Sequence, residues 1–364
     1  MRVMQLIPTL TVGGAERMVA TLTGHLRRSG HAVAVVSMYD PLGTWIEDAL
    51  RSEGVPLHFL GKRRGLDVRM VPRVARVIDG FRPDVIHTHL YTLKYALAAR
   101  AVRRRAVVHT VHSLAHTELD RWSRLVQRWA FRAGVVPVAI GDAVAASVRS
   151  AYGRPELRII PNGIPVSRYA PREGAGAAVR AALGISPETP TIVAVGMLNR
   201  AKNHEALLRA LASARLRAIG AHLLLAGDGE LRGPLEAEAR GLGLEGRVHF
   251  LGVRSDVVDV LAAGDVFALA SRWEGNPLSV MEAMAAGRPI VATAVGCLPE
   301  LVSARAGRLV PSGDAAALED ALVRVLSDPG LARAMGAAAA EVARARFDSA
   351  VMARAYEELY AQLA

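Results

Sequence analysis

Two patterns of apolar and polar positions alternate along the whole chain. Short runs that are apolar at nearly every position predict buried β-strands, and the segments between them carry apolar residues at helical spacing. Strands that are covered on both faces and separated by helices are typical of a parallel sheet in an α/β protein. The predicted strands are Val3–Ile7, Ala32–Ser37, Asp84–His87, Ala106–Thr110, Val136–Ile140, Thr191–Val195, His222–Ala226, Val248–Leu251, Val266–Ala270 and Pro289–Thr293.

Helical spacing is clear in three segments between the predicted strands, Gly14–Arg28, Tyr91–Arg103 and Glu118–Arg132. The alternation starts again after the turn Pro161–Pro165, and the Gly- and Ala-rich stretch that follows places a linker around residues 160–180. The sequence therefore predicts two doubly wound parallel-sheet domains of Rossmann type.

The predicted division of the 364 residues is a first domain of residues 1–165 and a second domain of residues 166–345. The Ala-rich tail predicts two closing helices, and we expect residues 346–364 to return to the first domain. Doubly wound sheets bind ligands at the carboxyl ends of their strands, so two of them in tandem predict a central cleft as the binding site.

Composition narrows the class of protein. Hydrophobic residues make up 51% of the chain and charged residues 22%, which excludes a disordered or fibrous protein. The sequence contains no run of about 18 uncharged apolar residues, so it predicts no membrane-spanning helix. The first residues predict a strand rather than a signal peptide. A single cysteine, Cys297, excludes a disulfide framework and a cysteine zinc site, and we expect a cytoplasmic protein.

The excess of positive charge is confined to the first half of the chain. Residues 1–165 contain 24 Lys and Arg against 12 Asp and Glu, whereas the remainder contains 21 against 22. Such a half attracts anions, namely phosphorylated ligands, an anionic membrane surface or nucleic acid. Aromatic residues make up only 5% of the chain and form no stacking platform, so we predict no nucleic-acid partner.

Two acidic residues flank a predicted helix start that follows the strand Val266–Ala270. Asn276 is a favoured N-cap and Pro277 a favoured first helical residue, so the free N–H groups of this helix predict an anion site. Glu274 precedes the helix start, and Glu282 lies about 7.5 Å along the helix axis. Carboxylates on either side of an anion site suit the hydroxyl groups of a sugar nucleotide, although each Glu taken alone is equally compatible with a solvated surface.

Two further loops are candidates for contact with phosphate. Gly13 and Gly14 open the first predicted helix, and glycine lets backbone approach a phosphate or a sugar closely. Lys202 is one of only three lysines among 45 basic residues, which favours a point charge that binds phosphate. The alternatives are a tight strand–helix turn for the glycines and an ordinary surface lysine.

One histidine, His112, follows the strand Ala106–Thr110 at its carboxyl end, where an imidazole is able to hydrogen-bond a sugar hydroxyl. His87 and His89 flank another strand end and are weaker candidates. Neither His-Glu-x-x-His nor Asp-x-Asp occurs in the sequence, so we predict no metal site. The glycines of Gly227–Gly233 are spaced one residue too far apart for a dinucleotide fingerprint, which makes a dehydrogenase a weak alternative.

Five motifs recur in a fixed order along nearly the whole chain. They are Val12–Arg17 (VGGAER), Pro161–Ile164 (PNGI), Gly227–Glu230 (GDGE), His249–Gly252 (HFLG) and the pair Glu274 and Glu282 with seven residues between them. Together they resemble the retaining glycosyltransferases of family 4. The resemblance implies the GT-B architecture, in which two Rossmann-like domains face a central cleft, and transfer of a sugar from a nucleotide donor with retained anomeric configuration.

The resemblance also implies roles for individual residues. Glu274, Lys202 and His112 would be catalytic, with Glu274 on the hydroxyls of the donor sugar and Glu282 on those of the ribose. A family arginine usually follows the glycine at position 196, but Met197 stands there, so Arg200 is the candidate replacement. The donor-binding set would be Gly13, Gly14, Gly196, Arg200, Gly275, Asn276, Pro277, Leu278 and Glu282.

The implied enzyme is a retaining, metal-independent hexosyltransferase that needs no cofactor. We expect a UDP-sugar donor, with a GDP-sugar next, and a hydroxyl of a glycan or lipid-linked acceptor, as in cell-surface polysaccharide or glycolipid assembly. The basic first domain would hold the acceptor and the second the nucleotide. The alternatives are a GT-B nucleotide-sugar epimerase and a non-catalytic sugar-nucleotide-binding protein, neither of which releases nucleotide in response to an acceptor.

The segment Glu118–Arg132 predicts contact with an anionic membrane surface. Its apolar residues form one helical stripe and its arginines another, which is the composition of helices that lie in a lipid interface. The runs Lys62–Arg64 and Arg103–Arg105 would add positive charge. The alternative is that the tryptophans pack on the sheet. The apolar stripe is Trp122, Leu125, Val126 and Trp129, and the basic stripe is Arg121, Arg124, Arg128 and Arg132.

Overall fold

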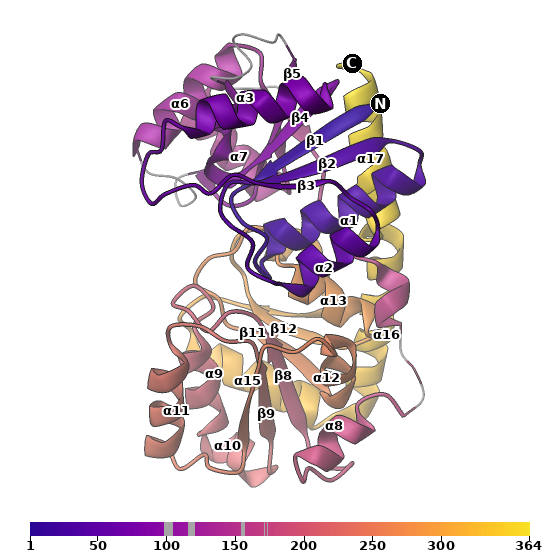
Figure 1. Ribbon diagram of the computed structural model, residues 1–364. Helices are drawn as coiled ribbons and strands as arrows, with labels where there is room; N and C mark the ends of the chain where they lie inside the picture. The colour runs from indigo at the N-terminus through magenta and orange to yellow at the C-terminus, as the bar shows by residue number, and fades with distance from the viewer. Residues whose placement is uncertain (98–104, 116–120, 154–156, 171, 173) are drawn as a thin grey trace. The chain divides into compact units, whose positions relative to one another are not determined.

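The computed structural model describes residues 1–97, 105–115, 121–153, 157–170, 172 and 174–364 (Figure 1). The chain forms two compact units. Unit 1 comprises Met1–Ile164 together with Ser349–Ala364, and unit 2 comprises Pro165–Asp348. The sequence places the corresponding boundaries at residues 165 and 345.

Unit 1 is built on a parallel sheet of seven strands in the order β3-β2-β1-β4-β5-β6-β7. Helices α1, α2 and α17 cover one face, and α3, α6 and α7 lie on the other (Figure 1). The strands are β1 (Arg2–Ile7), β2 (Ala32–Ser37), β3 (Leu57–Phe59), β4 (Val85–His89), β5 (Ala106–Val111), β6 (Val136–Ala139) and β7 (Arg158–Ile159). The helices are α1 (Gly14–Arg28), α2 (Trp45–Ser52), α3 (Met70–Phe81), η1 (Leu90–Thr92), α6 (Arg121–Arg132), α7 (Asp142–Tyr152) and α17 (Ser349–Ala361).

Unit 2 has a parallel sheet of six strands in the order β10-β9-β8-β11-β12-β13. The strands are β8 (Thr191–Val195), β9 (His222–Ala226), β10 (Val248–Gly252), β11 (Val266–Leu269), β12 (Ile290–Thr293) and β13 (Gly307–Val310). The helices are η2 (Val166–Tyr169), α8 (Ala177–Ala182), α9 (His204–Leu211), α10 (Ala214–Ala218), α11 (Arg232–Gly241), α12 (Val257–Ala263), α13 (Leu278–Ala285), α14 (Leu298–Leu301), α15 (Ala315–Leu326) and α16 (Pro329–Arg346).

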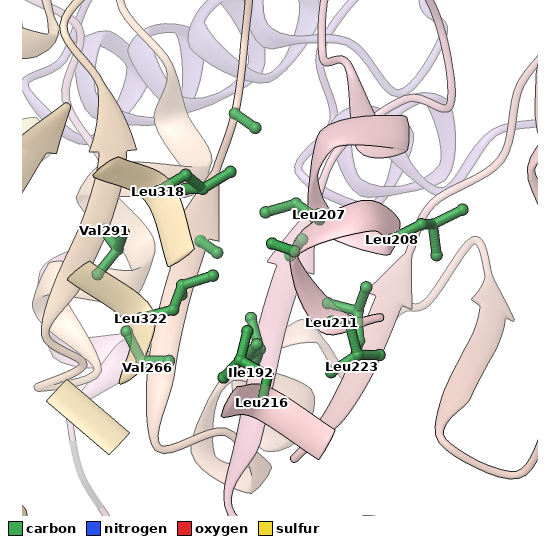
Figure 2. Close-up of a cluster of buried hydrophobic side chains, with 14 of the residues drawn as sticks. Ile192, Leu207, Leu208, Leu211, Leu216, Leu223, Val266, Val291, Leu318 and Leu322 are labelled. Carbon is green, nitrogen blue, oxygen red and sulfur yellow. The ribbon is translucent and has the colours of Figure 1, made fainter. Parts of the chain in front are cut away.

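The core of unit 2 shows why alternating patterns produce this fold. Leu207 and Leu211 of α9 and Leu318 and Leu322 of α15 face Ile192 and its neighbours on the sheet, and all are at most 2% exposed (Figure 2). Each buried leucine contributes about 1.5–3 kcal/mol by leaving water. Helices that carry one apolar stripe therefore cover a sheet that is apolar on both faces.

Three predicted segments differ in detail from the structure. The Gly- and Ala-rich stretch belongs to unit 2 and leads into α8 rather than forming a linker. Gly176, its N-cap, packs against α12 so closely that a Cβ would lie 2.4 Å from the nitrogen of Ala263. The predicted helix Tyr91–Arg103 begins as the short helix η1 and continues through residues 93–97, and its remaining residues lie outside the described ones. Residues 116–120, at the predicted start of α6, are also outside them.

The Ala-rich tail forms two helices, as predicted, and the second of them, α17, is part of unit 1. The PNGI turn lies against its start. The Ser349 amide donates to the carbonyl of Ile164 over 2.8 Å, and a Cβ on Gly163 would lie 2.7 Å from the Cα of Ser349. Close packing against the start of α17 therefore explains why a glycine occupies position 163. Among the described residues, no helix has the length and apolarity needed to cross a bilayer.

Candidate active site

Lys202 and Glu274 meet at the carboxyl ends of two neighbouring strands of unit 2. Lys202 lies in the loop after β8, and Glu274 lies in the loop after β11. The Lys202 ammonium donates to Oε1 of Glu274 over 2.6 Å, and the two side chains are 16% and 9% exposed. The sequence predicts these residues separately, as a phosphate contact and a sugar contact. In the structure they form one ion pair.

Three residues that the sequence analysis did not single out hold Glu274 in place. The Ser271 hydroxyl donates to Oε1 of Glu274 over 2.6 Å, and the Thr293 hydroxyl donates to the Ser271 carbonyl over 2.6 Å. Gly296 has a φ of +55°, and a Cβ there would lie 2.0 Å from the carbonyl oxygen of Glu274. Only glycine fits this position, but an isolated Gly or Ser in a loop gives no periodic signal in the sequence.

Helix α13 begins one residue later than predicted. Its N-cap is Pro277 rather than Asn276, because Pro277 has extended backbone (ψ 113°) and the helical residues start at Leu278. Pro277 itself makes no side-chain cap hydrogen bond to this helix. The amides of the first turn of α13 are of the kind that binds an anion, and the anion site at this helix start stays a prediction.

Glu282 lies inside α13 and is fully buried. Tyr169, at the end of η2, donates its hydroxyl to Oε1 of Glu282 over 2.9 Å and is itself 3% exposed. A buried carboxylate needs such hydrogen bonds because burial removes its hydration. The sequence analysis predicts Glu282 but not Tyr169, which is 113 residues away in the chain.

The glycine-rich loop after β9 supports the loop that carries Lys202. A Cβ on Gly227 would lie 1.9 Å from the carbonyl oxygen of Gly196, and a Cβ on Gly229 would lie 2.5 Å from that of Leu198. The Asp228 carbonyl accepts from the Leu198 amide over 3.0 Å. These glycines thus allow two strand-end loops to pack closely, which explains them without a dinucleotide.

Arg200, the expected second cation, lies in the same loop as Lys202, between β8 and α9. Met197 is 55% exposed, and Arg200 is exposed as well. Within the described residues, Arg200 makes no hydrogen bond or ion pair. Its role as a replacement for the family arginine stays a prediction.

The Gly13–Gly14 loop of unit 1 already lies against a carboxylate. Glu16, in the first turn of α1, is 7% exposed and accepts from the Thr11 hydroxyl over 2.9 Å. A Cβ on Gly13 would lie 2.3 Å from its Oε2. Burial raises the pKa of Glu16, which favours its neutral form at this helix start.

His112 is connected to the interior of unit 1 by a chain of hydrogen bonds. Its Nε2 lies 2.9 Å from Nδ1 of His89, whose Nε2 lies 2.8 Å from Oε1 of Gln5. Burial lowers the pKa of His112 to about 3, and burial also lowers the pKa of His89 well below its usual value. His112 is therefore neutral near pH 7 and acts as a hydrogen-bonding group rather than as a cation.

His87 is used for packing rather than for a strand-end site. Its Nδ1 lies 2.6 Å from the hydroxyl of Tyr360, and its Nε2 lies 2.7 Å from that of Thr110. Thr110 in turn lies 2.8 Å from the hydroxyl of Tyr356. Both tyrosines belong to α17, so this buried network fastens the C-terminal helix to β4 and β5 of unit 1.

Helix α6 leaves its tryptophans in solvent. Trp122 is 73% and Trp129 65% exposed, whereas Phe131 on the other side of the helix is fully buried. The alternative in which the tryptophans pack on the sheet is therefore wrong. The expected contribution of Lys62 to the basic surface is also wrong, because this residue is 7% exposed. Its ammonium donates to Tyr39 Oη over 3.1 Å and to two backbone carbonyls. Arg103 and Arg104 lie outside the described residues.

A cavity of about 370 Å³ lies beside the ion pair at the same strand ends of unit 2. Asn203, Arg272 and Thr293 line it, but neither Lys202 nor Glu274 does. Among the described residues, no three His, Cys, Asp or Glu side chains gather as a metal site would require. The candidate site is thus defined by the ion pair, the start of α13 and Glu282.

Two family models match this chain. Residues 12–168 match the model described as Glycosyltransferase Family 4, and residues 189–328 match that described as Glycosyl transferases group 1. Each model falls mainly on one unit, and the second covers the ion pair and α13.

Named relatives and solved structures agree with these matches. A D-inositol 3-phosphate glycosyltransferase of Corynebacterium diphtheriae is 32% identical over 309 residues, 78% of this chain and 71% of that protein. The UDP-Gal:alpha-D-GlcNAc-diphosphoundecaprenol alpha-1,3-galactosyltransferase of Escherichia coli is 29% identical over 307 residues, 79% of this chain and 78% of its own. The fold is similar to that of HepE from Anabaena, crystallised with UDP and glucose (TM-score 0.89, 23% identity, 100% of both chains).

Proposed function

Because this chain belongs to glycosyltransferase family 4 and has the two parallel-sheet units of the GT-B fold, we propose that it transfers a sugar with retained configuration. The proposed donor is a UDP-sugar, with a GDP-sugar next, and the proposed acceptor is a hydroxyl of a glycan or a lipid-linked saccharide. UDP-Gal in the name of the Escherichia coli relative and UDP in the HepE crystal support this donor.

The observation that carries the proposal is the pair of buried carboxylates around the start of α13. Glu274 and Glu282 are 8% and 0% exposed, and Lys202 stands beside the first of them. Glu274 would accept from hydroxyls of the donor sugar, and Glu282 from hydroxyls of the ribose. The diphosphate would lie between them, on the backbone N–H groups of Gly275, Asn276 and Leu278 and on Lys202.

In the proposed reaction, the bond between the anomeric carbon and the donor phosphate oxygen breaks, and a bond from that carbon to the acceptor oxygen forms on the same face. The acceptor proton passes to the departing phosphate oxygen. Lys202 and the first amides of α13 stabilise the charge that develops on the diphosphate, which is electrostatic catalysis. Because these groups supply the positive field, we propose that no metal ion is needed and that EDTA leaves activity unchanged.

His112 and the Gly13–Gly14 loop complete the proposed set from unit 1. A neutral imidazole suits a sugar hydroxyl better than it suits a phosphate, since it offers one donor and one acceptor and carries no charge. We therefore assign His112 to a hydroxyl near the reacting carbon, and Gly14, which has open space around its Cα, to close approach by the donor.

The experiment that tests this function measures nucleotide release from UDP-sugars and GDP-sugars with and without candidate acceptors. Release that depends on an acceptor supports a transferase. Interconversion of the donor sugar without an acceptor would instead indicate an epimerase, and binding without turnover a binding protein. Lys202→Ala should weaken UDP far more than uridine, and equal losses for the two ligands would contradict the phosphate assignment.

We further propose that α6 lies on the surface of an anionic membrane and gives access to a lipid-linked acceptor on its cytoplasmic side. Two tryptophans are exposed on this helix, and Arg128 and Arg132 are exposed beside them. Aromatic rings enter the interface of a bilayer, and arginines add about 1 kcal/mol each near anionic lipid.

Co-sedimentation with vesicles tests the membrane contact. Binding is expected to phosphatidylglycerol-containing vesicles at low salt, and not to phosphatidylcholine alone. Trp122→Ala with Trp129→Ala should abolish it. Trp45→Ala is the matched control, because Trp45 is also exposed (43%) but belongs to α2. Failure to bind anionic vesicles at low salt would leave a soluble acceptor as the better assignment.

A further inference from the structure

The two groups that the proposed function assigns to different parts of the donor form an ion pair with each other in the structure. The Lys202 ammonium is 2.6 Å from Oε1 of Glu274, although Lys202 is assigned to the diphosphate and Glu274 to the sugar. The same Glu274 oxygen accepts from the Ser271 hydroxyl over 2.6 Å. Binding of a nucleotide therefore changes an existing ion pair.

A diphosphate is able to reach Lys202 in two ways, because an ammonium has three N–H donors. If the phosphate displaces Glu274, that carboxylate keeps the Ser271 hydroxyl but loses its cation in a site where it is only 9% exposed. If the phosphate shares the ammonium with Glu274, two anions stand on one cation. Both arrangements oppose the phosphate, since a poorly hydrated charge depends strongly on its partners.

An intact donor differs from its product at this point. The donor sugar brings hydroxyl groups that donate to Glu274 and replace the bond lost from Lys202. A nucleoside diphosphate brings the negative charge without those hydroxyls. The cost of disturbing the ion pair is thus offset for the donor but not for the product.

We propose that the Lys202–Glu274 ion pair is a specificity device that weakens binding of the nucleoside diphosphate product relative to the intact donor, and so favours product release. This inference rests on the proposed function, because it uses the assignment of Lys202 to phosphate. Ser271 acts as a positioning residue, since its hydroxyl donates to the same Glu274 oxygen as Lys202 and keeps that carboxylate partly satisfied when the ammonium is withdrawn.

The test compares UDP affinity in the wild type and in Glu274→Gln, measured by calorimetry without an acceptor. Glu274→Gln removes the charge that competes for Lys202, so UDP is expected to bind roughly five- to tenfold more tightly, within the range of couplings between contacting residues. Glu205→Gln is the matched control, because it removes one carboxylate of another ion pair of unit 2, that with Arg272 at 3.5 Å. The control should change UDP affinity less than about twofold.

A double-mutant cycle separates release of Lys202 from simple removal of negative charge. In a Lys202→Met background, Glu274→Gln should lose most of its effect on UDP, because no cation is left to release. An undiminished gain in that background would overturn the role of the pair and indicate direct repulsion. Weaker or unchanged UDP binding in folded Glu274→Gln would overturn the inference altogether.

A second variant, Ser271→Ala, keeps the charge of Glu274 and should change UDP affinity in the opposite direction to Glu274→Gln. Ser271→Ala leaves Glu274 more dependent on Lys202, so UDP is expected to bind about two- to threefold more weakly. Tighter UDP binding in Ser271→Ala would contradict the inference. If the wild type binds GDP rather than UDP, GDP is the probe. If the wild type binds neither nucleotide, the proposed function is wrong and the inference fails with it. If it binds a nucleotide with an affinity that does not depend on Glu274, only the inference is wrong.

Discussion

The two units of the chain share a doubly wound parallel sheet but bury different kinds of polar group. In unit 1 the central strands carry buried neutral groups, in which histidine rings, Gln5 and the hydroxyls of α17 bond to one another. The charged residues that unit 1 buries lie outside these strands, and they are Glu16, Glu47, Lys62 and Asp67. Unit 2 buries charge, with Lys202, Glu274 and Glu282 at the carboxyl ends of its strands and the start of α13. The comparison shows that the same kind of sheet carries a neutral, mutually bonded network on the central strands of unit 1 and an ion pair at the strand ends of unit 2.

The largest expected difference between the two units is in acid, where unit 1 should unfold at a higher pH than unit 2. Burial lowers the pKa of His58 and, far more strongly, that of four other histidines in unit 1. In unit 2 burial lowers the pKa of His204 to about 4 and also lowers the pKa of the part-buried His222 and His249. The four are His87, His89, His109 and His112.

The sign follows from linkage. Below a pH of about 6.5 the unfolded chain protonates these histidines while the folded protein does not, so each lowers the free energy of unfolding by about 1.4 kcal/mol per pH unit. For His109 and His112 the loss continues down to their pKa of about 3. Glu16 has the opposite sign because its pKa is raised. Hydrogen exchange between pH 7 and pH 5 should lose protection in β4 and β5 before β8 and β11. Loss of protection in all four strands at the same pH would contradict the predicted difference in acid stability between the two units.

Gly296→Ala should displace the loop that carries Glu274 and so disturb the charged site of unit 2. The new Cβ adopts an unfavourable φ and meets the Glu274 carbonyl, which together should cost about 2–5 kcal/mol. Gly220→Ala is the matched control, because Gly220 has a similar φ of +64° but open space around it. The control should cost only about 1–2 kcal/mol. Urea unfolding and turnover measure both variants, and equal effects would show that the Glu274 loop tolerates movement.

Glu282→Ala should weaken UDP binding through the ribose. Loss of a charged acceptor for the ribose hydroxyls corresponds to about 1.5–3 kcal/mol. The wild type should discriminate between UDP and 2′,3′-dideoxy-UDP, and the variant should bind the two with nearly equal affinity. Retained discrimination in a folded Glu282→Ala protein would reject the ribose assignment.

The smallest expected effects come from two tyrosine-to-phenylalanine variants, each of which removes one buried hydroxyl from one of the two units. Tyr169 donates to Glu282 in unit 2, and Tyr152 donates to Gln127 over 2.6 Å in unit 1; both are buried. Each variant should lose about 1 kcal/mol of stability with the hydroxyl. Only Tyr169→Phe should also reduce discrimination between UDP and its dideoxy analogue, as calorimetry measures. An equal reduction in Tyr152→Phe would mean that the effect is not local.

The sequence by itself determined the class of fold and most of its elements. The predicted strands Ala32–Ser37, Thr191–Val195 and His222–Ala226 have the observed bounds, and so does helix Gly14–Arg28. Hydrophobic periodicity is a local property that depends on which face of a strand or helix is buried, so it can be read along the chain. The five motifs from Val12–Arg17 to the pair Glu274 and Glu282 likewise identified the family.

Only the tertiary structure decided which groups are partners. Lys202 and Glu274 are 72 residues apart, Tyr169 and Glu282 are 113 apart, and His87 and Tyr360 are 273 apart. It also decided that the tryptophans of α6 face solvent, since an apolar stripe at helical spacing fits a core and an interface equally well. These pairings depend on the order of the strands in each sheet and on the return of α17 to unit 1. No local pattern records that order, because a residue's own neighbours in sequence are the same whichever strand lies beside it.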